Sequence, residues 1–236
     1  MSPPNNGVFA DPAVRSAMAE SVFAELDNRL LARLVVDATL LEIPAGAIFI
    51  PQGTPPPTVH LLIRGFGRTF LASPTGRQAT IRYFRPGEVI GSASLFTTRE
   101  AIASGQCIVD SALLRFSAPV VQSLVANEVR VANAFNREMA LRLLAYFREL
   151  EETTFGTVRQ RLARHLLHVA AERQRGHELV VELTQQQLAD AIGSVREVVA
   201  RIVGELRREG LVRSDAKGIV INDAVALEAQ GWSAKT

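Results

Sequence analysis

The sequence predicts an α+β chain in which a turn-rich β barrel or jelly roll precedes a largely helical second half. All 11 prolines lie at or before Pro119, and eight of the 16 glycines fall between Gly46 and Gly105. Residues 120–236 contain no proline. Because proline and glycine form turns and end helices, this distribution separates a strand-rich first part from a helical second part.

The first part begins with an expected helix over residues 17–34. Its apolar side chains share one face: Phe23, Leu26, Leu30 and Leu34. Short apolar runs follow, separated by turns, at the nearly even spacing that is typical of a small antiparallel barrel or jelly roll. The expected strands are residues 40–43, 48–50, 59–63, 67–72, 79–84, 89–91, 103–109 and 112–116.

A long helix is expected next, because no residue between Pro119 and Glu152 breaks one. Such a helix is roughly 50 Å long at ~1.5 Å per residue. Apolar residues along it alternate steps of three and four, which is typical of helices that pack along each other. We expect it to form a homodimer interface through Phe135, Met139, Leu143, Tyr146 and Leu150. The alternative is a helix that packs only on its own barrel.

Residues 183–220 carry the pattern with the most chemical information. Residues 184–187 (Thr-Gln-Gln-Gln) and 194–197 (Ser-Val-Arg-Glu) each have the form of a capping box at a helix start. Gly193 permits a tight turn between the two helices, and Gly210 ends the second. Two short helices joined in this way are typical of a helix-turn-helix, and the apolar runs after Gly210 predict a β-hairpin.

The second of these helices has two distinct faces at about 100° per residue. Its apolar arc contains Val195, Val198, Val199, Ile202, Val203 and Leu206. The opposite arc is rich in arginine, with small residues between the arginines. Such a face fits a DNA major groove of ~12 Å width, where arginine donates to guanine and a carboxylate accepts from cytosine. The candidates for base contacts are Arg196, Glu197 and Arg201, with Arg213 and Lys217 of the hairpin for phosphate contacts.

These residues also have structural interpretations. Glu197 at the third helical position can simply cap the helix. Arg201 can pair with Glu197 or Glu205, four residues away on either side. The net charge of +2 is too small to argue for nucleic acid by itself, so the DNA hypothesis depends on where the arginines lie.

From about Phe23 to Ala226, the chain resembles the CRP/FNR family of bacterial transcription regulators. The β-roll of that family is matched by residues 43–46, 52–53, 61–65, 86–91 and 95–96, and its helix-turn-helix by residues 183–189 and 192–201. The resemblance implies three parts: an N-terminal helix with a β-roll sensor of the cyclic-nucleotide-binding type (1–118), a dimerisation helix (119–153) and a winged helix-turn-helix (154–236).

The resemblance implies a homodimeric, sequence-specific DNA-binding transcription regulator, which is not an enzyme. Its expected partners are double-stranded DNA with a palindromic site of GTGA-like half-sites, a second copy of the chain, and RNA polymerase. In the cyclic-AMP-type members, the residues matching Arg196, Glu197 and Arg201 read base edges. We expect Thr184, Gln185 and Ser194, at the helix starts, to contact DNA as well.

The expected effector pocket departs from that of the cyclic-AMP-type members. They place a glutamate where this chain has Ser92 after Gly91, and an arginine–serine pair that residues 97–104 lack, with Arg99 as the nearest substitute. Tyr146 and Phe147 stand where they have threonine and serine. We therefore expect an unknown small-molecule effector rather than cyclic AMP. No cofactor is identified.

Several other classes are disfavoured. The single cysteine, Cys107, excludes an intrachain disulfide and a cysteine-ligated iron–sulfur cluster. A cupin-type metal enzyme is an alternative, but only His60 lies in the barrel region, so no metal site is expected. The other alternative is an effector-free structural DNA-binding protein. No apolar run is long enough to cross a bilayer, and we expect a cytoplasmic protein without a membrane partner. Sensing roles for Cys107 and His60 stay open.

Overall fold

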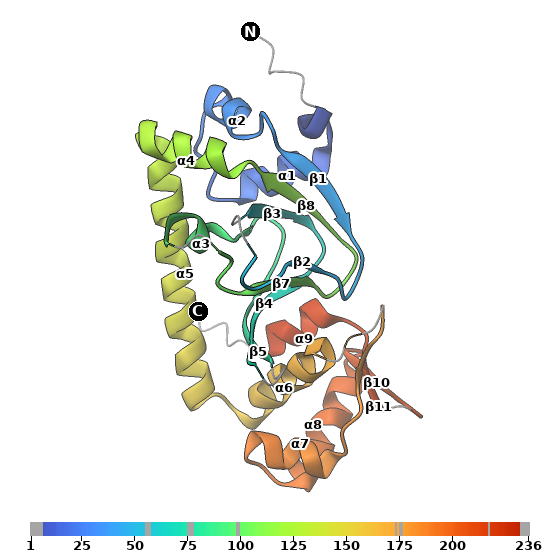
Figure 1. Ribbon diagram of the computed structural model, residues 1–236. Helices are drawn as coiled ribbons and strands as arrows, with labels where there is room; N and C mark the ends of the chain where they lie inside the picture. The colour runs from blue at the N-terminus through green and yellow to red at the C-terminus, as the bar shows by residue number, and fades with distance from the viewer. Residues whose placement is uncertain are drawn as a thin grey trace. The chain divides into compact units, whose positions relative to one another are not determined.

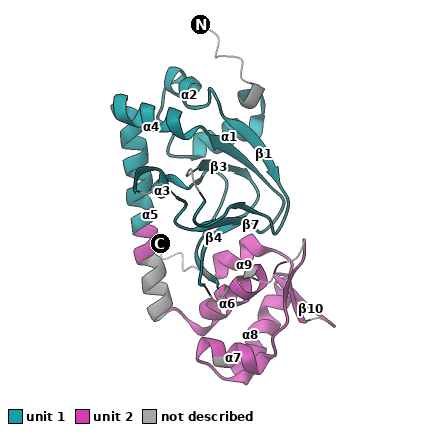
Figure 2. Cartoon of the chain, viewed as in Figure 1, with its two compact units in different colours: residues 1–143 teal, residues 144–236 magenta. Residues whose placement is uncertain are grey.

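The computed structural model describes residues 7–54, 58–74, 78–97, 100–172, 174, 177–216 and 218–231, apart from the side chains of residues 7, 8, 79, 148–155, 172 and 190. The chain forms two compact units, residues 1–143 and 144–236 (Figure 2). The boundary between them falls within one helix, α5 (Val129–Phe155). Each unit is therefore described by itself.

The first unit contains two four-stranded antiparallel sheets, which we call the β-roll (Figure 1). One sheet has the order β1-β8-β3-β6, with bounds Thr39–Ile43, Ser111–Phe116, Val59–Arg64 and Val89–Ile90. The other has the order β2-β7-β4-β5, with bounds Ile48–Ile50, Ser104–Cys107, Gly67–Ala72 and Gln78–Phe84. The strands and the β-rich first part predicted by the sequence are confirmed, with small shifts at the ends.

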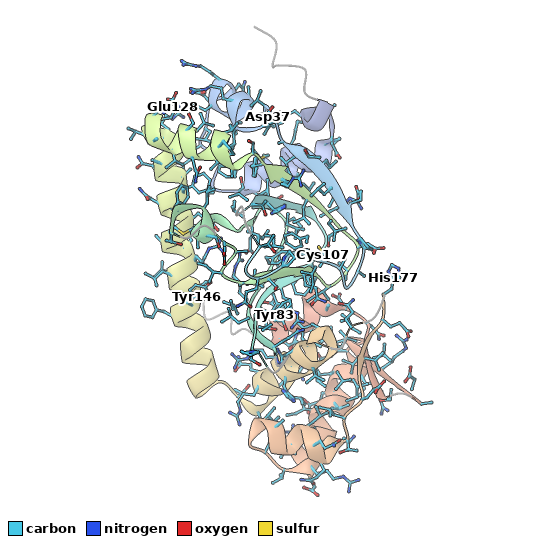
Figure 3. The ribbon with its side chains drawn as sticks, in the orientation of Figure 1. Asp37, Tyr83, Cys107, Glu128, Tyr146 and His177 are labelled. Carbon is cyan, nitrogen blue, oxygen red and sulfur yellow. The ribbon has the colours of Figure 1, made fainter. Side chains whose placement is uncertain are left out.

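Side chains from both sheets meet inside the β-roll. This interior cluster consists of Ile50, Leu62, Phe84, Ile90, Ala101, Cys107 and Leu113. Figure 3 labels Cys107 among them. A second, larger cluster joins strands β3 and β8 to the flanking helices. Burying each large apolar side chain stabilises the fold by about 1.5–3 kcal/mol, so these two clusters hold the unit together.

The prediction of one helix over residues 17–34 is wrong. The structure has α1 (Pro12–Glu20) and α2 (Asn28–Leu34), after a short 3-10 turn at Gly7–Ala10. The Ser21 hydroxyl donates to the Met18 carbonyl at 2.8 Å and ends α1, and the Asp27 carboxylate accepts the Leu30 N–H at 2.9 Å and starts α2. The four apolar residues are nevertheless all buried, with Phe23 and Leu26 in the connection and Leu30 and Leu34 on α2.

The single long helix expected from Pro119 onward is also interrupted. It consists of α4 (Ala118–Asn127) and α5, separated at Glu128, whose backbone is extended at φ −127°, ψ 101° (Figure 3). The Glu128 carbonyl accepts the N–H groups of Val131 and Ala132 at 2.9 and 3.1 Å, so it begins α5. Its carboxylate pairs with Arg33 of α2. The side chain at the break therefore contacts a residue that is distant in sequence.

Phe135 is not on the surface, where it was expected to contribute to the dimer interface. Its side chain is only 3% exposed, and its ring packs edge-on against Phe23 and Phe96 at centroid distances of 5.5 and 5.4 Å. It therefore belongs to the core of its own unit. Leu143 and Tyr146 are 54% and 38% exposed, whereas the side chain of Leu150 lies outside the described residues.

Charged side chains attach α5 to the β-roll beside β6. Arg142 of α5 pairs with Glu138 one turn earlier and donates to the Val89 carbonyl at 2.6 Å. Arg82 of β5 pairs with Glu88 and donates to the same carbonyl at 3.0 Å. Burial, and then the charge of Arg142, lower the pKa of Arg82, and the two glutamates oppose this shift. Arg82 and Arg142 therefore donate to the same backbone acceptor, the Val89 carbonyl. Each of them also pairs with a carboxylate of its own.

The second unit is a small helical bundle with a three-stranded sheet. Its helices are α6 (Val158–Glu172), α7 (Gln185–Ile192), α8 (Arg196–Arg208) and α9 (Ala224–Gln230). The sheet has the order β10-β11-β9, with bounds Val212–Asp215, Gly218–Ile221 and Leu179–Val181. The hairpin β10–β11 confirms the prediction, while β9, α9 and the short α3 (Ser92–Thr97) of the first unit are additional elements.

Replacing Gly91 or Gly53 of the β-roll by alanine should lower the stability of the protein by different amounts. Gly91 has φ +88°, and a Cβ there would lie 2.0 Å from the Thr58 carbonyl oxygen. Gly53 has φ +77°, with nothing within 4 Å of its Cβ position. Gly53→Ala should cost only the left-handed backbone penalty of about 1–2 kcal/mol. Gly91→Ala should cost clearly more in urea unfolding, because β3 and β6 must also separate. Equal losses in the two variants would contradict this close approach.

Candidate nucleic-acid interface

The start of α7 is closed by a reciprocal pair of side-chain bonds. The Thr184 N–H donates to Gln187 Oε1 at 2.9 Å, and the Gln187 N–H donates to Thr184 Oγ1 at 3.2 Å. This confirms the first predicted capping box. Gly193, at φ +64°, turns the chain toward α8, and the Ser194 N–H returns to the Ala189 carbonyl at 2.9 Å. The helix-turn-helix predicted from the sequence is therefore present.

The second predicted capping box is wrong. The residue that precedes α8 is Val195, which is extended at φ −117°, ψ 152° and makes no side-chain cap bond. Ser194 stands one residue before this N-cap, and its N–H donates to the Ala189 carbonyl of α7. Val195 is 56% exposed rather than part of the apolar face. Glu197 is exposed and has no capping bond to make, which favours an outward role for its carboxylate.

Helix α8 presents its two faces as predicted, apart from Val195. The buried side chains are Val199, Ile202, Val203 and Leu206. The exposed side chains of the opposite face are Arg196, Glu197, Arg201, Arg207 and Arg208. An exposed helix face with several guanidinium groups and one carboxylate matches the donors and acceptors of base edges in the major groove. This face is the candidate interface.

Arg201 has a carboxylate partner that is itself held from inside the unit. Its Nη1 donates to Glu205 Oε1 at 2.9 Å, so of its two expected partners the structure selects Glu205. The other oxygen, Glu205 Oε2, accepts from Arg159 Nη1 of α6 at 3.1 Å. Arg159 also donates to Glu209 at 2.6 Å and to Gln230 of α9 at 3.1 Å. Sequence reasoning missed Arg159, because it lies 46 residues before Glu205 and no local pattern marks it.

Arg161 of α6 supports the turn between the two helices. Its Nε donates to the Ile192 carbonyl at 3.1 Å, at the end of α7, and its Nη1 donates to the Gly156 carbonyl at 2.7 Å. One guanidinium therefore joins the start of α6 to the end of α7. The sequence did not predict this role of Arg161, because every residue has a backbone carbonyl and no residue type marks the acceptor.

The other residues expected to contact DNA differ in their exposure and in their hydrogen-bond partners. Arg213 of β10 is exposed and donates to Asn222 at 2.8 Å and to Glu178 at 3.3 Å. Lys217 lies outside the described residues. Thr184 is exposed with its hydroxyl engaged in the cap, and Gln185 is half-buried.

The expected effector residues fall in both units. In the first, Gly91 follows β6 and Ser92 starts α3, and the Ser92 side chain is fully buried. Its hydroxyl has no hydrogen-bond partner within the described chain. In the second, Tyr146 and Phe147 are 38% and 60% exposed on α5. Arg99, the possible phosphate partner, lies outside the described residues.

Neither His60 nor Cys107 is charged near neutral pH. Burial, with a smaller contribution from Arg115, lowers the pKa of His60 to about 3, and its ring packs against Phe49. Burial raises the pKa of Cys107 to about 11, although a bond with Ser111 opposes this. No cluster of three or more metal-ligating side chains occurs in the described ranges. No helix among these ranges is long and apolar enough to span a membrane.

Two family models match the chain. The model described as a Crp-like helix-turn-helix domain matches residues 160–230, which contain α7 and α8. The model described as a cyclic nucleotide-binding domain matches residues 40–128, which contain most of the β-roll.

Relatives resemble most of the chain. The transcriptional regulator LdrP of Thermus thermophilus is 31% identical over 188 residues, which cover 75% of this chain and 89% of LdrP. The CRP-like cAMP-activated global transcriptional regulator of Mycobacterium tuberculosis is 24% identical over 210 residues, which cover 87% of this chain and 94% of that protein.

Solved structures share the fold. The c-di-GMP responsive global regulator CLP of Xanthomonas campestris is 21% identical with a TM-score of 0.53, covering 84% of this chain and 100% of that chain. FixK2 from Bradyrhizobium japonicum is 19% identical with a TM-score of 0.53, covering 84% of this chain and 98% of that chain. The predicted α+β arrangement of β-roll, long helix and helix-turn-helix is confirmed.

Proposed function

The chain belongs to the CRP/FNR family of transcription regulators, and from this premise we propose that it acts as a homodimer that reads a palindromic DNA site with GTGA-like half-sites. The family consists of transcription regulators, not enzymes, so the metal-enzyme alternative is set aside. RNA polymerase is the proposed protein partner, and the cytoplasm is the proposed compartment.

The exposed face of α8 carries this proposal. Arg196 and Arg201 offer paired N–H donors that fit guanine O6 and N7, and Glu197 offers an acceptor for cytosine N4. The buried face of α8 fixes this helix on its unit, so the three side chains are held outward together. Arg213 and Lys217 of the hairpin, with Thr184, Gln185 and Ser194, are proposed to contact the DNA around these bases.

The exposed apolar stripe of α5 supports the homodimer. Val129, Leu143, Leu144 and Phe147 are 75%, 54%, 53% and 60% exposed. At 100° per residue they fall within an arc of about 100°, opposite the residues that bind the β-roll. Burying such a stripe against its symmetry mate removes apolar area from water on both subunits. Met139 and Tyr146 lie about 40° and 60° outside this arc, on the side of Leu143. We propose residues 1–118 as sensor, 119–153 as dimerisation segment and 154–236 as DNA-binding domain.

The first test concerns base recognition by Arg196. Arg196→Ala should weaken specific binding by about 1–3 kcal/mol and relax the preference at one guanine of each half-site, because two donors to that base are lost. Binding to random DNA should fall much less. Fluorescence anisotropy with a site selected from random DNA measures both.

Arg207→Ala is the matched control, since Arg207 is an exposed arginine near the other end of α8. It should leave the base preference unchanged. Equal losses of Arg196→Ala on specific and random DNA would assign Arg196 to a phosphate instead.

The second test concerns the dimer. Leu143→Glu should place like charges close together across a symmetric seam, so sedimentation should show monomers and binding to the palindrome should collapse. Leu141→Glu is the control, because Leu141 is 51% exposed but lies about 60° outside the arc of the stripe and about 160° from Leu143. A dimeric Leu143→Glu variant with unchanged DNA affinity would place the seam elsewhere.

The third test concerns cyclic AMP, which we infer is not the effector. Ser92 stands where the cyclic-AMP-type members have a carboxylate, and residues 97–104 lack the arginine–serine pair that holds the cyclic phosphate in those members. Each lost charge-assisted contact costs roughly 1.5–3 kcal/mol, so the affinity should fall by a few powers of ten. Calorimetric titration with cyclic AMP and cyclic GMP should show no micromolar binding. A micromolar dissociation constant for either would contradict the inference and assign the phosphate to Arg99.

A further inference from the structure

We propose that Glu205 is a positioning residue for DNA recognition: held by Arg159, it orients the guanidinium of Arg201 toward one base. This proposal rests on the proposed function, because it assumes that Arg201 faces DNA. It concerns a residue that touches no base itself. The experiment below separates failure of this proposal from failure of DNA recognition as a whole.

Glu205 lies between one half-buried and one exposed arginine. Glu205 binds both arginines at once, Oε1 to Arg201 at 2.9 Å and Oε2 to Arg159 at 3.1 Å. The side chains of Arg159 and Glu205 are 26% and 25% exposed, whereas that of Arg201 is 65% exposed. The carboxylate is therefore fixed from the inner side and holds the outer arginine.

Orientation matters because guanine accepts from two N–H groups of one guanidinium in a defined plane. A free arginine on an exposed helix samples many rotamers, and binding must select one of them. Arginine has five N–H donors in a rigid fork. When Glu205 takes one at Nη1, the Nε and Nη2 groups of Arg201 keep free donors for a base. A guanidinium that is already oriented loses less conformational entropy on binding than one that rotates freely.

Arg159 also reduces the repulsion between the Glu205 carboxylate and the phosphates of DNA. A glutamate on a groove-facing helix repels phosphates, and this repulsion acts on every DNA sequence alike. The charge of Arg159, only 3.1 Å from Glu205 Oε2, compensates the carboxylate. An ordinary exposed pair four residues apart contributes little. The pair between Arg201 and Glu205 differs from such a pair because Arg159 also binds Glu205. Arg159 is in turn bound by Glu209 and Gln230.

Glu209 provides a matched control for Glu205. It accepts from Arg159 Nη2 at 2.6 Å, so its removal disturbs the same anchor and removes the same charge. It ends α8, beyond the pair with Arg201. Both Glu205→Gln and Glu209→Gln remove one negative charge and alter one contact with Arg159, at 3.1 and 2.6 Å respectively. Of the two glutamates, Glu205 also binds Arg201.

The experiment starts with the full-length wild-type protein, which selects its site from a random DNA library. Affinities for this site, for single-base variants of it and for random DNA are then measured by anisotropy at one salt concentration. Arg201→Ala identifies the base pair that Arg201 reads. Glu205→Gln should lower discrimination at that base pair by about three- to tenfold, without loss of affinity for random DNA. Glu209→Gln should keep discrimination within about twofold of the wild type.

Glu205→Asp is the second variant, with thermal unfolding as the check on the fold. It keeps the charge but is one methylene shorter, so it cannot reach both arginines, and it should lose discrimination as Glu205→Gln does. Wild-type discrimination in Glu205→Gln, at a base pair where Arg201→Ala loses it, would overturn this proposal alone. An equal rise in affinity for specific and random DNA would also overturn it. A wild-type protein that selects no sequence would instead contradict the proposed function.

Discussion

The attachment of one face of α5 to the β-roll is the constraint on which the rest of the molecule depends. Arg142 and Glu138 are 12% and 13% exposed, and removing such charges from water is costly. The Val89 carbonyl and the mutual pairing offset this cost, so this side of the helix has one defined position. Because a helix turns 100° per residue, Leu143 and Phe147 must then point away from the β-roll. The exposed stripe is a geometric consequence of the buried pair.

Arginine serves the second unit in two different ways. Of the 26 basic residues in the chain, 24 are arginines. Arg159 and Arg161 turn inward, where their several donors join helices through carboxylates and backbone carbonyls. Arg196 and Arg201 turn outward on α8. The same planar group fits both tasks, because it donates several bonds in fixed directions whether the acceptor is a carboxylate, a carbonyl or a base edge.

The sequence predicted those features that depend on local periodicity and turn residues. Strand positions, the Gly193 turn and the outward face of α8 follow from such patterns. The breaks at Ser21 and Glu128 do not, because neither position has the glycine or proline that marks a helix end in a sequence. A hydroxyl bond lies at the first break and an ion pair to a distant arginine at the second. The link from Arg159 through Glu205 to Arg201 was missed for a related reason. Periodicity identified Glu205 as a partner, but its anchor lies in another helix.

Two titratable side chains in the interior of the β-roll keep one protonation state over a wide pH range. Between pH 5 and 9, His60 stays neutral because its pKa is about 3, and Cys107 stays a thiol because its pKa is about 11. Neither group changes charge in this range, and a buried thiol reacts slowly with oxidants. A change of state in the described interior must therefore come from contacts that differ between two conformations. The Val89 carbonyl is one contact between the β-roll and α5, since both Arg82 and Arg142 bind it.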